Sequence, residues 1–313
     1  MAAWKIMIAD GLEENGLQTL RESAEVVNRN GISADDLIKE IGSYQALIVR
    51  GRTKVTAQVL EAATSLKVVG RAGVGVDNID LKAARERGIA VVNSPYATTV
   101  AVAELAMALM LSMARDVPRG DAGMKNGKWL KKDMEGVELY RKTLGIIGFG
   151  RIGSSVARRA EAFDMKVMCY DPKITGDNQS LYNCRAASLD ELLAQADFIS
   201  LHVPLNSSTR GLLNREKFAL MKDGVRIIDV SRGGVIDEQA LLEALESGKV
   251  AAAALDVFTT EPPGQTALVS HPRVVCTPHI GAQTVEAQQR AAADIASEIL
   301  AGLRGDELRW RVA

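Results

Sequence analysis

The stretch KTLGIIGFGRIGSSVARRA, residues 142–160, decides the fold. An apolar run typical of a strand leads directly into Gly148-Phe149-Gly150-Arg151-Ile152-Gly153, and an amphipathic pattern typical of a helix follows. A strand, a glycine-rich turn and a helix in this order form the phosphate-binding turn of a dinucleotide site. We expect Gly148 to permit the tight turn, Gly150 to let the backbone approach a pyrophosphate, and Gly153 to let helix and strand pack closely.

An acidic residue lies at the distance that such a turn requires. A second strand pattern ends at Asp171, 18 residues after Gly153. A carboxylate there accepts hydrogen bonds from ribose hydroxyls and repels a ribose phosphate, which favours NAD over NADP. Lys173, close by, is the one residue that argues for NADP. The alternative is a glycine-rich turn without a ligand, and the helix and the acid in register argue against it.

A second Gly-x-Gly occurs in GRAGVGVDN, residues 70–78. Asp77 and Asn78 follow it where a third glycine and a helix would be needed, so it is a poor pyrophosphate turn. Two interpretations stay open. One is a nest of backbone N–H groups for a small anion such as a carboxylate, with Arg71 beside it. The other is a plain tight turn.

Length and composition indicate an ordinary globular protein. The 313 residues predict about two domains, and 47% hydrophobic with 25% charged residues allow a sizeable core. A net charge of −1 provides no overall field for nucleic acid or an anionic membrane. The most apolar helical pattern, residues 98–116, is interrupted by Glu104 and predicts a buried or interface helix instead of a membrane span.

The termini and cysteines suggest where the protein resides. Three widely spaced cysteines without a CxxC pair argue against a disulfide framework or a zinc site, and we expect no metal. They fit a reducing cytoplasm. The N-terminal residues read directly into a strand and predict no signal peptide.

Strand and helix patterns alternate along the chain, which predicts α/β architecture with parallel sheets covered on both faces. Ten strands are too many for one comfortable doubly wound sheet, so we expect two, with the first four strands in one and the last six in the other. A boundary is expected near residues 91–99, and a final helix over 285–303 is expected to return to the first unit. The predicted strands are Lys5–Ala9, Ala46–Val49, Lys67–Val69, Ala90–Val92, Thr143–Ile147, Lys166–Tyr170, Phe198–Leu201, Arg226–Val230, Ala251–Leu255 and Val274–Cys276.

Three polar residues after predicted strands suit reversible hydride transfer to a 2-keto acid, because ligands bind beyond the carboxyl ends of parallel strands. His279 is a suitable general acid and base. Glu261, before two prolines, would stabilise the imidazolium and orient the ring. Arg232, followed by two glycines, would hold the substrate carboxylate and polarise the carbonyl.

Each of these residues also has a plainer interpretation. Arg232 is also compatible with a surface charge, Glu261 with a loop acid and His279 with a loop histidine. Of the other two histidines, we expect His271 in a surface turn and His202 in a structural role beside the cofactor.

Taken together, seven segments resemble the D-isomer-specific 2-hydroxyacid dehydrogenases, in the family's order. They are GRAGVGVDNID (70–80), RKTLGIIGFGRIG (141–153), YDP (170–172), HVPL (202–205), SRGGVIDEQAL (231–241), AALDVFTTEPP (253–263) and TPHIGAQT (277–284). The resemblance implies a Rossmann NAD-binding domain, residues 96–284, inserted into a flavodoxin-like substrate-binding domain, residues 1–95 and 285–313. It further implies Arg232, Glu261 and His279 as the catalytic triad and a homodimer built through the nucleotide domains.

The resemblance also implies the ligand contacts. Substrate contacts fall on Arg50, Arg71, Val74, Gly75, Arg232 and His279. Cofactor contacts fall on Gly148, Gly150, Arg151, Ile152, Gly153, Asp171, His202, Val203, Pro204, Val230, Ser231, Asp256 and Gly281.

The cations favour a phosphorylated substrate within this family. Arg50, Arg52 and Lys54 share one short loop, and residues 128–132 (KWLKK) are a second source; solvated loop charges are the alternative. Another D-2-hydroxyacid dehydrogenase, such as a glyoxylate or hydroxypyruvate reductase, is the alternative activity. A transcriptional corepressor that senses NAD is an alternative of another class. Many members carry regulatory domains after the final helix; since this sequence ends at Ala313, we expect no control through them.

Overall fold

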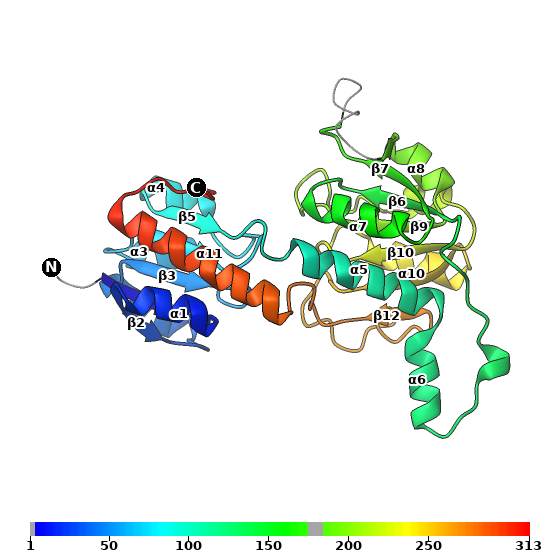
Figure 1. The fold of residues 1–313 in the computed structure, drawn as a ribbon, viewed down its shortest axis with the longest axis horizontal. Helices are drawn as coiled ribbons and strands as arrows, with labels where there is room; N and C mark the ends of the chain where they lie inside the picture. Colours follow the sequence, from blue (N-terminus) through cyan, green and yellow to red (C-terminus); the bar gives the residue numbers. More distant parts are fainter. Residues whose placement is uncertain (1–3, 175–183) are drawn as a thin grey trace. The chain divides into compact units, whose positions relative to one another are not determined.

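The computed structural model describes residues 4–174 and 184–313. The chain divides into two compact units (Figure 1). Unit 1 comprises Met1–Thr99 and Ala282–Ala313, and unit 2 comprises Val100–Gly281. The assignment of the substrate to unit 1 stays a prediction.

Unit 1 is a five-stranded parallel sheet covered by helices on both faces. Its strand order, β2-β1-β3-β4-β5, is the flavodoxin-like order and confirms the predicted fold. One face packs on α1 and α11, where Ile295 and Ile299 belong to the same buried apolar cluster as Ile6 and Ile8, and α2, α3 and α4 cover the other. Its elements are β1 (Trp4–Ile8), α1 (Glu14–Arg21), β2 (Ala24–Asn28), α2 (Ala34–Glu40), β3 (Ala46–Val49), α3 (Ala57–Ala62), β4 (Val68–Arg71), α4 (Leu81–Glu86), β5 (Ala90–Asn93) and α11 (Val285–Arg304).

Unit 2 is a seven-stranded parallel sheet in the order β12-β11-β10-β9-β6-β7-β8. Numbered within the unit this is 3-2-1-4-5-6 with a seventh strand added, so the predicted Rossmann order is confirmed. Its elements are α5 (Thr99–Ala114), α6 (Val117–Lys125), β6 (Thr143–Ile147), α7 (Arg151–Glu161), β7 (Lys166–Tyr170), β8 (Arg185–Ala186), α8 (Leu189–Gln195), β9 (Phe198–Leu201), α9 (Arg215–Leu220), β10 (Val225–Asp229), α10 (Glu238–Glu246), β11 (Val250–Leu255) and β12 (Val274–Cys276).

Two edge strands escaped the sequence pattern, because the described residues form twelve strands and not ten. β2 has the sequence AEVVN, in which Glu25 and Asn28 are exposed, so it lacks a continuous apolar run. β8 has two residues, too few for any periodicity to appear. Both are edge strands, and each forms backbone hydrogen bonds with only one neighbouring strand.

The expectation that the cysteines are unpaired is wrong. Cys169 and Cys184 form a disulfide, with a Cα–Cα distance of 6.2 Å. Cys169 lies in β7, and Cys184 directly precedes β8, which pairs with β7 in parallel register. Two cysteines 15 residues apart thus reach neighbouring strands. The cysteines therefore no longer indicate a reducing compartment.

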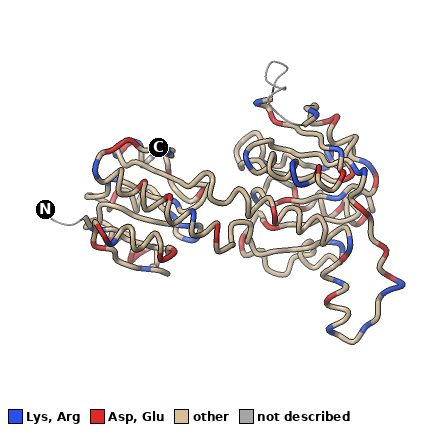
Figure 2. The backbone as a smooth tube through the Cα atoms, viewed as in Figure 1, with Lys and Arg blue, Asp and Glu red and all other residues tan. Residues whose placement is uncertain are grey.

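Charges of both signs are interspersed along both units (Figure 2). Within residues 4–174 and 184–313, no helix is both long and apolar enough to cross a membrane. Among the same described residues, no three or more His, Cys, Asp or Glu side chains lie close enough together to hold a metal ion.

Candidate active site

The glycine-rich turn has the geometry that a dinucleotide site requires. Gly148 has a φ of 90°, and a Cβ on Gly153 would lie 2.2 Å from the Gly148 carbonyl oxygen. A side chain at Gly153 is thus excluded by the contact between strand β6 and helix α7. A Cβ on Gly150 would meet nothing within 4 Å, so the backbone faces open space there. No side chain caps the N-terminus of α7, which leaves this end for an anionic ligand.

Asp171 adjoins this turn. Its Oδ2 atom accepts a hydrogen bond from the Phe149 N–H at 2.9 Å, and Oδ1 accepts from the Lys173 N–H at 2.9 Å. The acid at the end of β7 and the turn after β6 are therefore neighbours, as their spacing predicts. Open backbone at Gly150, an uncapped helix end and an adjacent carboxylate fit the phosphates and ribose of NAD.

His202 supports the turn from β9. A Cβ on Gly148 would lie 2.6 Å from the His202 carbonyl oxygen, so the two loops touch. The ring Nε2 of His202 lies 2.9 Å from Ser200 Oγ. Burial lowers the pKa of His202 to about 3, so the ring is neutral at physiological pH. These contacts agree with the structural role expected for this histidine.

The predicted triad comes from three loops at the carboxyl edge of the seven-stranded sheet. His279 Nδ1 lies 2.7 Å from Glu261 Oε2, and both side chains are partly exposed, at 47% and 38%. Arg232 follows β10, and its Nη1 donates to the Ser231 carbonyl at 2.7 Å. A Cβ on Gly233 would lie 1.8 Å from the Phe258 carbonyl oxygen. The loop of Arg232 therefore packs closely on the loop that carries Glu261.

The electrostatics of Glu261 favour a carboxylate. Partial burial raises its pKa, but hydrogen bonds from His279 and the Phe258 N–H, with the charge of Arg232, outweigh burial and leave the pKa below its ordinary value. An ionised Glu261 fixes a proton on Nδ1 of His279. Nε2 is then the ring nitrogen left to exchange a proton with a substrate.

Asp256 holds the loop of His279. Its buried carboxylate accepts from Thr277 Oγ1 at 2.6 Å and from the N–H groups of Ile280 and Gly281, each at 2.8 Å. His279 has a φ of 53°, a left-handed conformation that a non-glycine residue adopts only where its surroundings impose it. The family resemblance implied a cofactor contact for Asp256, and these hydrogen bonds show that it also holds the loop of His279.

Asp229 is a buried acid that the sequence reasoning missed. It is 2% exposed at the end of β10, and Oδ1 accepts from both the N–H and Oγ of Ser231, at 2.8 and 2.6 Å. Burial raises its pKa to about 7, against hydrogen bonds from Ser231 that lower it. Its position just before Val230-Ser231-Arg232 was the available signal.

The predicted substrate residues of unit 1 lie at the carboxyl ends of neighbouring strands in their own sheet. Arg71 ends β4 and is in register with Val49, so Arg50 follows at the same level. Asn93 at the end of β5 is in register with Arg71, and its Nδ2 donates to the Val74 carbonyl at 2.6 Å. Arg50, Arg71 and the Val74-Gly75 turn are thus brought together, whereas Asn93, which holds the turn, was not foreseen.

His271 lies in a turn, where Nδ1 accepts from the Arg273 N–H at 3.2 Å.

Comparisons with known proteins assign the family. Residues 107–281 match the profile of the D-isomer specific 2-hydroxyacid dehydrogenase, NAD binding domain. A glyoxylate reductase from Paecilomyes thermophila has a TM-score of 0.91 at 32% identity, covering 100% of this chain and 99% of that one. A D-lactate dehydrogenase from Aquifex aeolicus, complexed with NAD and lactic acid, has a TM-score of 0.82 at 31% identity over 96% of each chain. The chain belongs to the D-isomer-specific 2-hydroxyacid dehydrogenase family, and NAD is its cofactor.

Among curated proteins, the chain is similar to the D-3-phosphoglycerate dehydrogenase of Methanocaldococcus jannaschii. The two are 48% identical over 303 residues, which cover 96% of this chain and 58% of that protein. The chain thus spans little more than half the length of this curated relative.

Proposed function

We propose that this protein oxidises D-3-phosphoglycerate to 3-phosphohydroxypyruvate with NAD, the first step of serine biosynthesis. The observation that carries the proposal is the His279–Glu261 pair beside Arg232, at the sheet edge that also bears the dinucleotide turn. The likeness to D-3-phosphoglycerate dehydrogenases supports the choice of substrate. Arg50 and Arg71, at the carboxyl ends of strands in unit 1, supply cations for an acid that carries both a carboxylate and a phosphate.

In this proposal the residues divide the work as follows. Bound NAD supplies the acceptor for the hydride that leaves C2 of the substrate. His279 Nε2 takes the proton from the C2 hydroxyl, and ionised Glu261 stabilises the imidazolium that results. Arg232 binds the substrate carboxylate and the oxygen on C2, which limits the poses that can react. In the reverse direction, His279 returns the proton.

The alternative activity, glyoxylate or hydroxypyruvate reduction, has one specific observation in its favour. The Paecilomyes thermophila enzyme, whose structure is similar to this chain over its full length, is a glyoxylate reductase. The same triad serves both reactions, because both interconvert a hydroxyl and a carbonyl next to a carboxylate. The substrates of the two reactions differ in the phosphate group, so a site for the phosphorylated acid needs more cationic side chains.

A homodimer formed through unit 2 is part of the proposal. Helix α6 and the segment after it project from the sheet of unit 2 (Figure 1). This arm exposes apolar side chains, with Val117 at 52%, Met124 at 59% and Trp129 at 77%. A pocket of about 430 Å³ lies between α6 and residues 128–134. Exposed apolar area of this kind fits a second copy of the chain. Trp129→Glu should convert the dimer to a monomer in analytical ultracentrifugation, and an unchanged mass would reject this interface.

The location of the protein is a further part of the proposal. We place it in the cytoplasm, as the sequence led us to expect, but the Cys169–Cys184 disulfide removes the cysteines from the grounds for this location. Separation of cells into soluble and membrane-bound or exported fractions, followed by an NAD-dependent activity assay, tests this. Recovery outside the soluble cytoplasmic fraction would reject it.

A substrate panel tests the proposed activity. Purified protein should reduce NAD with D-3-phosphoglycerate at a kcat/KM at least about tenfold above that for D-glycerate or D-lactate, because one charge-assisted contact to the phosphate is worth ~1.5–3 kcal/mol. In the reverse direction, 3-phosphohydroxypyruvate should be preferred to glyoxylate and hydroxypyruvate. A preference for the unphosphorylated acids would reject the substrate and support the alternative reductase.

A further inference from the structure

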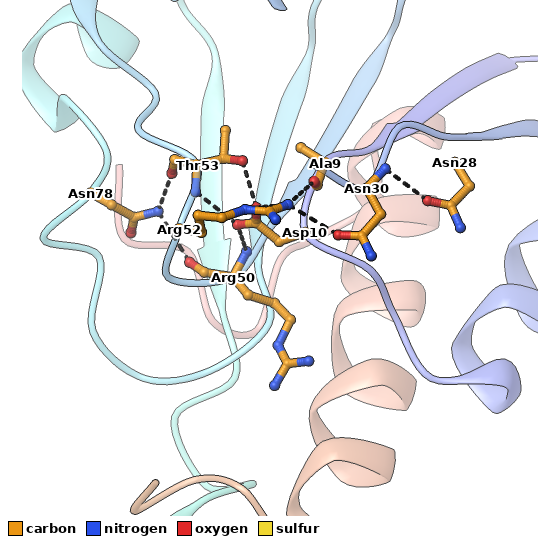
Figure 3. Close-up of polar contacts among 8 residues, drawn as sticks. All are labelled: Ala9, Asp10, Asn28, Asn30, Arg50, Arg52, Thr53 and Asn78. Atoms are coloured by element: carbon orange, nitrogen blue, oxygen red, sulfur yellow. Dashed lines mark hydrogen bonds and ion pairs between the residues drawn. The ribbon is translucent and has the colours of Figure 1, made fainter. Parts of the chain in front are cut away.

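Asp10 is a buried acid in unit 1 that none of the predicted sites includes. It follows β1, and its side chain is 3% exposed. It lies beside the loop of residues 50–53, which follows β3 and begins with the predicted substrate residue Arg50 (Figure 3). A carboxylate buried next to a site for an anionic substrate requires an explanation, because its charge would repel that substrate.

Both oxygens of Asp10 are occupied by this loop. Oδ2 accepts from the backbone N–H of Arg50 at 2.8 Å and of Thr53 at 3.0 Å. Oδ1 accepts from Thr53 Oγ1 at 2.5 Å and from the Arg52 guanidinium at 3.3 Å. On the other side of the loop, Asn78 Nδ2 donates to the carbonyls of Arg50 and Thr53, at 3.1 and 2.7 Å. The N–H and the C=O of Arg50 are therefore both fixed by side chains from other loops.

The two arginines of the loop have different surroundings. The Arg52 guanidinium donates to the Ala9 carbonyl, to Asp10 and to Asn30 Oδ1, at 3.1, 3.3 and 3.0 Å. Arg50 points away from this cluster, and its guanidinium contacts the neutral amide of Gln283 at 3.2 Å (Figure 3). Among the described residues Arg50 forms no ion pair, whereas Arg52 is paired with Asp10.

We propose that Asp10 is a positioning residue for Arg50. It fixes the backbone of the 50–53 loop so that the Arg50 guanidinium is held ready for the acidic group of the substrate. Arg52 balances the charge of Asp10 and does not bind the substrate, contrary to the count of three cations that the sequence indicated. The inference rests on the proposed function, since it takes Arg50 to face an anionic 2-hydroxy acid. A preorganised cation binds more tightly because less conformational freedom is lost on binding.

The test combines variants of Asp10 and Arg50 in the full chain. Asp10→Ala should raise the KM of the acid about tenfold or more, the equivalent of ~1.5 kcal/mol. Arg50→Gln should raise it by at least as much, and the double variant should be no worse than Arg50→Gln alone. Asp10→Asn should recover most of the affinity, because its carbonyl still accepts the two backbone N–H groups. KM losses that add in the double variant would overturn the proposal.

Two further readouts separate positioning from general damage. Amide hydrogen exchange of a peptide covering residues 50–55 should rise in Asp10→Ala and not in Arg50→Gln. The KM for NAD should stay within about twofold of wild type in every variant. Asp35→Ala, which removes an exposed acid of α2, is the matched control and should leave all values unchanged. Faster exchange with an unchanged KM for the acid would overturn the proposal.

The design covers two other outcomes. If Asp10→Ala is insoluble, Asn78→Ala frees the same backbone from the carbonyl side and should also be non-additive with Arg50→Gln. If the wild type prefers an unphosphorylated acid, the proposed substrate fails, and the Asp10 test proceeds with the preferred acid. The Kd of that acid, measured by calorimetry with NADH present, repeats the comparison without turnover, because NADH cannot accept the hydride. Equal Kd values for wild type and Asp10→Ala would overturn the positioning role alone.

Discussion

His279 Nδ1 and Glu261 Oε2 lie 2.7 Å apart, although their residues come from two loops separated by strand β12. The contact is maintained by Asp256, which binds the loop of His279, and by the Phe258 N–H, which donates to Glu261 at 3.1 Å. The pair therefore has its own structural support within unit 2. The roles of its members can be tested one at a time.

Glu261→Gln should lower turnover without weakening the binding of NAD. The carboxylate lies 2.7 Å from His279 Nδ1, and against the effect of burial the hydrogen bond from His279 lowers the pKa of Glu261, so the side chain is ionised. An amide in its place has no charge, and kcat should fall about tenfold or more, because a hydrogen bond to a charged group contributes ~1.5–3 kcal/mol. Steady-state kinetics that give kcat and the KM for NAD separately measure this. An unchanged kcat would show that the carboxylate does not act on the ring.

Gly233→Ala should disturb the triad through packing. The added Cβ would lie 1.8 Å from the Phe258 carbonyl oxygen, so the loops that carry Arg232 and Glu261 have to separate. We expect a loss of about 1–3 kcal/mol in the free energy of unfolding and a fall in kcat. Gly248→Ala is the control, because Gly248 has a φ of 81° but no neighbour within 4 Å, so it should lose stability and keep its kcat. A normal kcat in Gly233→Ala would show that the loop contact is dispensable.

Asp171→Ala should weaken the preference for NAD over NADP. The carboxylate lies beside the glycine-rich turn, where it can accept from ribose hydroxyls and repel a phosphate. We expect the kcat/KM for NAD to fall about tenfold or more, the equivalent of ~1.5 kcal/mol for a charge-assisted hydrogen bond. The value for NADP should fall less or rise. Equal losses with the two cofactors would argue against a contact with the ribose.

Asp229→Asn should change how stability depends on pH. The pKa of Asp229 is raised from 3.8 to about 7 in the folded protein, so the folded state holds the proton more tightly than the unfolded chain. The stabilisation from this proton is complete below about pH 4 and is lost as the pH rises to about 7. The free energy of unfolding of the wild type should therefore fall by up to about 3 kcal/mol between pH 5 and pH 8 through this group. The variant lacks this loss, so its stability relative to wild type should rise by the same amount. Urea unfolding at both pH values measures this, and a constant difference would contradict the burial of the charge.

The sequence alone predicted the elements that have a clear hydrophobic pattern or a glycine-rich turn. The strand, turn and helix around Gly148 and the two parallel sheets are examples, because buried parallel strands read as short apolar runs between amphipathic helices. The edge strands β2 and β8 were missed for want of such runs. The Cys169–Cys184 disulfide was missed because it depends on which strands become neighbours, and spacing alone does not show that.

The candidate site followed the same division. Arg232, Glu261 and His279 were identified because each follows a strand and because their motifs occur together. Residues that act on the backbone of other loops, such as Asp10, carry no sequence signal of their own. Asp10 is one acid among 39 Asp and Glu residues, and only its hydrogen bonds distinguish it. The pairing of Arg52 with Asp10 was missed for the same reason, since a run of cations does not show which of them is already paired.

The most direct test of the central claim compares turnover and NAD binding in His279→Ala. A positioned acid and base contributes ~100- to 10,000-fold to the rate, so kcat should fall by at least about 100-fold. The Kd for NAD, followed by fluorescence titration, should stay within about twofold of wild type. His271→Ala, in the turn before β12, is the matched control and should turn over normally. A kcat for His279→Ala within about threefold of wild type would contradict the account.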